Sequence, residues 1–185
     1  MYELKKHMEK LHEIYEFAEY LKLKTWSAME SIQDDLELYG ELTKEERELD
    51  AEVTFDGKVL KIIVKDCLPR RPMIKKSLLK SASLLRQYWA GNITSAIRRL
   101  PEPVRFEKAV CIIKIITPKN IEWDVDNRAI NIIINSLRMT QVIKNDSWNK
   151  LSLYISGGVD KDNPRTEIMV TEQPHDPISL LLNTS

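Results

Sequence analysis

Three aspartates in the second half of the chain are the residues best suited to chemistry. Two of them, Asp124 and Asp126, flank a single valine and are followed by Asn127. In an extended backbone, residues at this spacing project to the same side, so the two carboxylates can share one cation. Asp126 or Asn127 is equally well placed to cap a following helix, and Asp124 to end a strand. Both interpretations remain open from the spacing of this pair alone.

Asp146 supplies a third carboxylate, twenty residues after Asp126. If a helix fills that interval and the chain returns alongside its start, we expect Asp146 to approach Asp124 and Asp126. Three oxygen donors suit Mg²⁺, with Mn²⁺ as an alternative, because such ions also accept phosphate oxygens as ligands. A metal held this way activates water and neutralises charge on phosphorus. The three aspartates therefore predict a metal site for phosphodiester hydrolysis.

Charge is divided along the chain, although it sums to zero. Residues 1–50 carry 7 Lys and Arg against 14 Asp and Glu, a net charge of −7, and residues 51–185 carry 21 against 14, a net charge of +7. Residues 66–119 alone hold 12 basic groups and three acidic ones. This asymmetry favours a polyanionic partner, although basic faces also occur on proteins that bind no nucleic acid.

Hydrophobic periodicity indicates a mixed α+β fold behind these residues. Residues 1–50 are predicted to form an acidic helical extension, with Leu4, Met8, Leu11, Tyr15 and Ala18 at helical spacing and a second helical stretch from about Ser27 to Tyr39. This extension either packs on the core or dimerises, and recruitment of a protein partner is the alternative. Strands and helices follow, with these expected bounds: strands Ala51–Phe55 and Lys58–Lys65 joined by an Asp56-Gly57 type I′ turn, helix Met73–Trp89, strand Arg105–Thr117, helix Asn127–Met139, a strand around Leu151–Ser156 and strand Arg165–Thr171. The apolar run Val110–Ile116 is typical of a strand covered on both faces, so Arg105–Thr117 is expected to be the central strand.

Composition excludes several other classes of protein. No apolar run reaches the ~18 to 20 residues of a membrane helix, and the charged N-terminus lacks the apolar core of a signal peptide. The two cysteines, Cys67 and Cys111, stand 44 positions apart without a zinc-binding pattern. We therefore expect a cytoplasmic protein without a membrane partner.

The stretch from Asp124 to Val170 resembles the RusA family of Holliday-junction resolvases of bacteria and prophages. The resemblance rests on Asp124-Val125-Asp126-Asn127 opening a helix, Asn135-Ser136-Leu137 within it, Val142-Ile143-Lys144-Asn145-Asp146 after it, and Pro164-Arg165-Thr166-Glu167-Ile168 at the last strand. It extends more faintly back to Val59 through the loop Pro69-Arg70-Arg71-Pro72.

The resemblance implies a homodimeric, Mg²⁺-dependent endonuclease that nicks four-way DNA junctions in recombination and repair. By its motif, Asp124, Asp126 and Asp146 are the metal-binding catalytic carboxylates. It also implies a nuclease domain of residues 51–172, with a RusA-like sheet and packed helices. Residues 173–185 are predicted to form a C-terminal tail.

Two departures from the family pattern concern activity. The family lysine, four residues after the second aspartate, falls on Ile130 or Asn131, and the first member of an Asp-Asp pair is Asn145. Loss of one donor to the reacting group costs ~10² to 10³ in rate elsewhere. Arg128 and Lys144 are candidate replacements for the missing cation. A catalytically weak or inactive DNA-binding or adaptor protein is therefore the alternative function.

Basic residues around the motif are predicted to position branched DNA by contacts with phosphates, without reading bases. They are Arg70, Arg71, Lys75, Lys76, Arg128 and Lys144. Three tryptophans either stack on exposed bases or, as we favour, pack in the protein: Trp89, Trp123 and Trp148.

Overall fold

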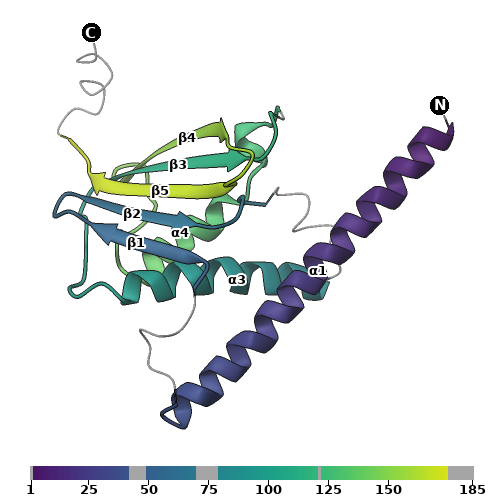
Figure 1. The fold of residues 1–185 in the computed structure, drawn as a ribbon. Helices are drawn as coiled ribbons and strands as arrows, with labels where there is room; N and C mark the ends of the chain where they lie inside the picture. Colours follow the sequence, from purple (N-terminus) through teal and green to yellow (C-terminus); the bar gives the residue numbers. More distant parts are fainter. Residues whose placement is uncertain (1, 42–48, 70–78, 121, 175–185) are drawn as a thin grey trace. The chain divides into compact units, whose positions relative to one another are not determined.

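The computed structural model of the chain describes residues 2–41, 49–69, 79–120 and 122–174. These ranges contain helices, strands and one short 3-10 turn (Figure 1). In chain order they are α1 (Tyr2–Leu38), β1 (Ala51–Phe55), β2 (Val59–Val64), α3 (Leu79–Arg98), β3 (Ala109–Thr117), the turn η1 (Val125–Asn127), α4 (Ile130–Met139), β4 (Leu151–Val159) and β5 (Arg165–Glu172). The mixed α+β class predicted from the sequence is confirmed.

The five strands form one mixed sheet in the order β1-β2-β5-β3-β4. Strand β5 is antiparallel to both of its neighbours, β2 and β3. Strand β4 lies at the edge, parallel to β3, with Ala109 opposite Leu151 and Thr117 opposite Val159. Because α4 connects these two parallel strands, β3, α4 and β4 form a crossover unit. The sequence predicts β3 as the central strand, whereas β5 occupies the middle of the sheet.

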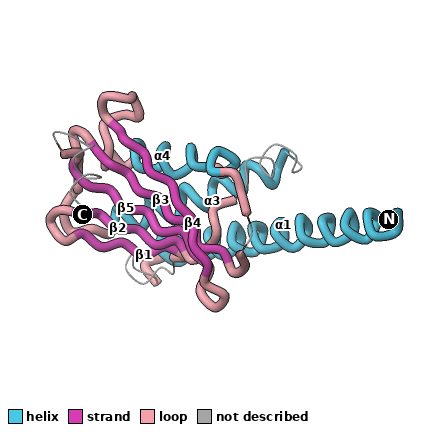
Figure 2. The backbone as a smooth tube through the Cα atoms, turned by 90° about the horizontal axis from the view of Figure 1, so that it is seen from above, coloured by secondary structure: helices cyan, strands magenta, loops and turns pink. Residues whose placement is uncertain are grey.

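One face of the sheet carries the core. Ile62, Ile168 and Ile113 lie side by side on β2, β5 and β3, and each is fully buried. The second half of α3 and all of α4 lie on the same side of the sheet (Figure 2). These helices bury large side chains, namely Trp89, Ile93, Ile133 and Leu137. Each such side chain contributes about 1.5–3 kcal/mol by leaving water.

The apolar run in β3 is covered differently from the prediction. A strand buried on both faces is expected, but buried and half-buried residues alternate from Ala109 to Lys114. Alternation of this kind is typical of a sheet with one face on the core and the other partly open. The half-buried positions of β3, such as Ile112 and Lys114, therefore belong to the face that α4 does not cover.

The chain divides into two compact units: residues 1–48 with 72–88, and residues 49–71 with 89–185. The sequence predicts an uninterrupted domain over 51–172, whereas this division assigns the first half of α3 to the unit that holds α1. Within that first unit, the Trp26 ring meets the Tyr88 ring edge-on, with centroids 5.4 Å apart. Leu23 of α1 is buried.

Two local predictions at the start of the chain also need correction. Helix α1 runs without a break over 37 residues, where two helical stretches are expected. A type I′ turn requires positive φ at both central residues, but only Gly57 has it, at 91°. Asp56 instead accepts hydrogen bonds from the N–H groups of Val59 and Lys58, at 2.7 and 2.9 Å. These two donors lower the pKa of the Asp56 carboxyl.

Candidate functional site

The aspartate pair lies between the end of β3 and the start of α4. Asp124 has extended backbone angles, and the turn η1 begins directly after it. The Asn127 N–H donates to the Asp124 carbonyl at 3.0 Å. Both Asp124 and Asp126 are exposed. The pair is therefore open to solvent, but only Asp124 has the extended backbone assumed above, because Asp126 lies within the 3-10 turn.

Neither aspartate caps the helix that follows. Ala129 occupies the N-cap position of α4, and no side-chain cap hydrogen bond is formed there or at the start of η1. The prediction that Asp126 or Asn127 caps this helix is wrong, because both residues lie in the 3-10 turn and the helix begins only at Ile130, after Arg128 and Ala129. Helix capping therefore does not account for the pair.

Arg128, directly after the turn, is a buried side chain and not a surface one. It is 7% exposed, and its Nη1 donates to the Leu68 carbonyl at 2.6 Å. Its guanidinium also lies over the Trp123 ring, with Cζ 4.7 Å from the ring centroid. The prediction that Arg128 contacts DNA phosphates or replaces the family lysine therefore needs correction, because the guanidinium is enclosed by protein.

Trp123 in turn packs against the edge strand. A methyl group on Gly157 of β4 would come within 3.0 Å of the indole ring, so a larger residue there would require the ring to move by a few tenths of an ångström. The Ala129 N–H donates to the Pro69 carbonyl at 3.0 Å, beside the Arg128 contact with Leu68. The segment that carries the aspartates is thus fixed on both sides, to β4 and to the chain after β2.

Asp146 lies apart from this pair. It follows α4, whereas Asp124 and Asp126 precede it, and ten residues of helix span about 15 Å. Its carboxylate forms an ion pair with Arg138 in the last turn of α4, at 3.4 Å. Within the described ranges, no three carboxylate, imidazole or thiol side chains form a group that could hold a metal ion. The expected convergence of the three aspartates in one chain is therefore wrong.

The cause of this separation is the parallel pairing of β3 and β4. Asp124 and Asp126 follow the end of β3, whereas Asp146 precedes the start of β4. Because the two strands are parallel, these residues lie at opposite ends of the strands. A parallel bridge between Phe106 and Ile143 holds the chain after α4 beside the chain before β3. The expectation assumed that the chain returns to the start of the helix, and it does not.

Four of the residues predicted to contact DNA lie outside the described residues: Arg70, Arg71, Lys75 and Lys76. Lys144 lies near Asp146 and is 58% exposed. Its Nζ contacts the Glu107 carboxylate at 3.2 Å, and Lys150 contacts the same carboxylate at 3.6 Å. The hydrogen bond from Lys144, together with both positive charges, lowers the pKa of Glu107.

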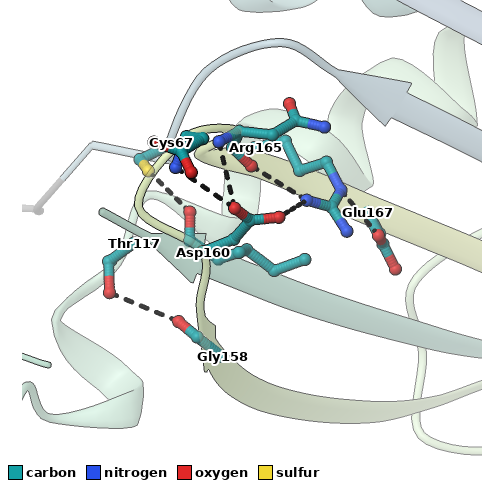
Figure 3. Close-up of polar contacts among 9 residues, drawn as sticks. Cys67, Thr117, Gly158, Asp160, Arg165 and Glu167 are labelled. Atoms are coloured by element: carbon teal, nitrogen blue, oxygen red, sulfur yellow. Dashed lines mark hydrogen bonds and ion pairs between the residues drawn. The ribbon is translucent and has the colours of Figure 1, made fainter. Parts of the chain in front are cut away.

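Sequence reasoning does not find a second polar cluster, where β4 turns into β5 (Figure 3). Arg165 donates from Nη1 to Asp160 at 2.9 Å and from Nε to Glu167 at 2.8 Å. The Arg165 hydrogen bond is the main reason that the pKa of Asp160 is lowered, and both carboxylates raise the pKa of Arg165. The Arg-x-Glu spacing on one strand face is the sequence signal for half of this cluster.

A shallow hollow adjoins this cluster on the face of the sheet opposite the core. Its charged lining residues balance, three cationic against three anionic: Lys61, Lys65, Arg165, Glu52, Asp162 and Glu167. Lys65 and Glu52 are themselves paired, at 2.9 Å. A balanced and internally paired lining does not favour a polyanion, so this hollow does not replace the predicted DNA-binding surface.

The tryptophans divide between packing and exposure. Trp89 is fully buried and Trp123 is half-buried under Arg128, as the packing interpretation predicts. Trp148 is 90% exposed, in the loop that also holds Lys144 and Asp146. Packing within this chain does not account for Trp148.

Neither a protein-family model nor a curated protein matches this sequence. Among solved structures, the chain is similar to the periplasmic domain of MotB of Helicobacter pylori, at 11% identity and a TM-score of 0.33, over 73% of this chain and 94% of that one. A second MotB periplasmic domain aligns at 10% identity and a TM-score of 0.30, over 81% of this chain and 89% of that one. Similarity at this level supports no argument about function.

In the part of the chain that the structure describes, no helix combines the length and the apolar character needed to cross a membrane.

Proposed function

We propose that this chain is a Mg²⁺-dependent endonuclease of the RusA type, which resolves four-way DNA junctions by phosphodiester hydrolysis. The proposal joins the sequence resemblance to one observation, the exposed pair Asp124 and Asp126 on a segment fixed by Trp123 and Arg128. It includes a homodimer and a cytoplasmic location, where the DNA substrate is found.

The pair fits the ligand chemistry of Mg²⁺, which binds to one or two protein carboxylates and otherwise keeps waters or phosphate oxygens. A bound ion would polarise the phosphoryl oxygens and generate a hydroxide nucleophile. Asp124 and Asp126 would provide the anionic ligands between the end of β3 and the start of α4. The buried Arg128 holds their segment in place and acts as a positioning residue.

A second candidate function, DNA binding without efficient cleavage, is favoured by two other observations. Asp146 is paired with Arg138 beyond α4 and does not complete the site within the chain. The first residue of α4, where the resemblance leads us to expect a lysine, is Ile130. Without that cation, the transition-state charge on the phosphate has one fewer partner.

The two candidates are separated by incubating the purified full chain with a labelled four-way junction, in Mg²⁺ and in chelator. The nuclease predicts nicks that require metal and that fall at least ~10²-fold in Asp126→Asn, while junction binding persists. Asp162→Asn is the matched control, because Asp162 is an exposed aspartate in the β4–β5 turn and should keep full activity. Binding with no metal-dependent nicks in wild type supports the second candidate.

Asp146→Asn then tests the role that the resemblance assigns to the third aspartate. If Asp124 and Asp126 bind the metal without it, this variant cleaves at the wild-type rate. If the cleavage rate of Asp146→Asn falls as much as that of Asp126→Asn, Asp146 belongs to the metal site. It would then be supplied by a partner chain or by a rearrangement on DNA. Junction affinity should also fall steeply with salt, because Arg70, Arg71, Lys75, Lys76 and Lys144 are proposed to neutralise phosphates.

A further inference from the structure

The two ends of the sheet differ in charge. Strands β2, β3 and β4 begin at one end, where β1 and β5 finish. The described loops at that end, with the two residues on either side of each, hold eight basic and five acidic residues: Lys58, Arg98, Arg99, Arg105, Lys108, Arg138, Lys144 and Lys150, against Asp56, Glu102, Glu107, Asp146 and Glu172. We call this the basic end.

The opposite end of the sheet carries the aspartate pair and is acidic. Counted in the same way, its described loops hold five basic and eight acidic residues: Lys65, Lys119, Arg128, Lys161 and Arg165, against Asp50, Glu52, Asp66, Glu122, Asp124, Asp126, Asp160 and Asp162. A polyanion is therefore attracted to the basic end and repelled from the other, unless a cation is bound there.

Three lysines of the basic end surround one carboxylate. Glu107 contacts Nζ of Lys144 at 3.2 Å and Nζ of Lys150 at 3.6 Å, so two ammonium groups share a single negative charge. Lys108 is exposed, and Glu172 accepts a hydrogen bond from its backbone N–H at 3.3 Å, not from its ammonium group. Because exposed ion pairs are weak, a phosphate can replace Glu107 as the partner of either lysine.

Trp148 projects from the same end, in the loop between Lys144 and Lys150. Its side chain is 90% exposed, although tryptophan is highly buried on average. The loop is closed by the Ser147 carbonyl, which accepts from the N–H groups of Lys150 and Leu151 at 2.9 and 3.0 Å. The indole is therefore held in solvent by an ordered loop.

The neighbours of Trp148 indicate what kind of partner covers it. The adjacent residues are polar, namely Ser147 and Asn149, and both are exposed. An interface with an apolar protein surface, or insertion into a membrane, needs further apolar side chains around the ring. A nucleic-acid base is flat and apolar on its faces, and its strand carries phosphates for nearby lysines. Because paired bases already stack on each other, the base faces are accessible in an unpaired strand.

We propose that the basic end binds an unpaired nucleic-acid strand. Trp148 stacks on a base, and Lys108, Lys144 and Lys150 contact the phosphates beside it. This binding needs neither a metal nor cleavage, so it does not rest on the proposed nuclease activity. It also lies away from the aspartate pair, because the eight residue steps of β3 that separate the two ends span about 26 Å.

Binding of a labelled oligothymidine of about 15 nucleotides to the full chain tests the stacking, with chelator present throughout. Trp148→Leu keeps an apolar side chain but removes the flat ring, and it should weaken binding about 5- to 150-fold. Trp148→Tyr should retain most of the affinity. Equal affinity of wild type and Trp148→Leu would overturn the proposal, as would tighter binding of the same strand in a duplex.

The salt dependence of that binding tests the phosphate contacts. Lys108→Gln with Lys144→Gln should lower the slope of log affinity against log salt by about 1.4, because each contact with a single strand contributes about 0.7. Lys119→Gln with Lys161→Gln is the matched control, since it removes the same charge from exposed residues at the opposite end. Its slope should equal that of wild type. Equal slopes for the two double variants would show that only net charge matters and would overturn the proposal.

The same measurements separate this proposal from the nuclease. Loss of junction cleavage in Asp126→Asn, with oligothymidine binding unchanged, would support both. Oligothymidine binding without any metal-dependent cleavage in wild type would support the basic end alone. If wild type binds anionic phospholipid vesicles but not oligothymidine, the basic end is a membrane contact and this proposal is wrong.

Discussion

The guanidinium of Arg128 lies over the indole of Trp123, 4.7 Å from the ring centroid, on the segment that carries Asp124 and Asp126. A planar, delocalised cation suits such a stack, and its remaining donors stay available for hydrogen bonds. One of them reaches the Leu68 carbonyl. This hydrogen bond joins the chain after β3 to the chain after β2, and the stack holds together the two ends of the segment that carries the aspartates.

Arg128→Ala should therefore destabilise the protein by about 2–4 kcal/mol, because it removes a partly desolvated stack and leaves a buried carbonyl without its donor. Urea unfolding measures the change. Arg105→Ala, at an exposed arginine, is the control, and its free energy of unfolding should lie within about 0.5 kcal/mol of the wild-type value. Weaker DNA binding with unchanged stability would instead show that Arg128 reaches phosphate.

Gly157 and Gly158 offer a matched pair on β4. An alanine methyl at Gly157 meets the Trp123 ring at 3.0 Å, whereas one at Gly158 meets the flexible Lys114 side chain at 3.2 Å. We expect Gly157→Ala to lower the free energy of unfolding by about 1–3 kcal/mol and to shift the indole. Gly158→Ala should lower it less, because a lysine side chain moves easily. Unfolding curves followed by tryptophan fluorescence test both variants. Equal costs would argue against close packing of Trp123 on β4.

Much of the fold follows from periodicity in the sequence, because each core strand and helix has its own hydrophobic pattern. The apolar run in β3 and the helical spacing of Ile133 and Leu137 place both elements on the core. The strand order cannot be read from these patterns, because β5 lies between β2 and β3 and pairs with residues distant in the sequence. Local pattern carries no information on which distant strands meet.

The candidate site was less predictable for the same reason. The spacing of Asp124 and Asp126 identifies an exposed pair, but the position of Asp146 depends on the direction of β4, which no local pattern determines. Arg128 has the charge of a DNA contact in the sequence, but in the structure it is 7% exposed and donates to the Leu68 carbonyl, which lies 60 residues away in the sequence. Residue type alone does not distinguish a binding arginine from a structural one.

The two cysteines should differ in reactivity. Burial raises the pKa of Cys111 to about 12, so almost no thiolate forms at neutral pH. Cys67 is half-buried, and its Sγ lies 3.0 Å from the Ile116 carbonyl. We expect a thiol reagent to modify Cys67 slowly in the native chain and Cys111 only in denaturant. Native Cys67→Ser should therefore remain unmodified; rapid labelling of that variant would contradict the burial of Cys111.

The Asp160–Arg165 pair should stabilise the chain in a pH-dependent way. The Arg165 hydrogen bond lowers the pKa of Asp160 below its ordinary value of 3.8. A carboxyl with a lowered folded-state pKa contributes stability above its unfolded-state pKa and loses it as pH falls through the folded-state value. Asp160→Asn should therefore lower the melting temperature by a constant amount between about pH 7 and about pH 5, with the difference vanishing well below pH 3.8. A difference that persists at about pH 2 would show that charge is not its source.

Trp148 provides a test of the proposed DNA binding. It is 90% exposed, yet its loop is held by Ser147, whose Oγ donates to Asn149 at 2.8 Å and whose carbonyl accepts from Leu151 at 3.0 Å. An exposed indole on a fixed loop can stack on an unpaired base, which is worth about 1–3 kcal/mol, or about 5- to 150-fold in affinity. Trp148→Ala should therefore weaken junction binding by that factor without changing stability, and Trp148→Phe should retain most of the affinity. If Trp148→Ala binds as tightly as wild type does, bases do not stack on this loop. The proposed junction contact would then lie near Asp124 or at the basic residues between β2 and α3.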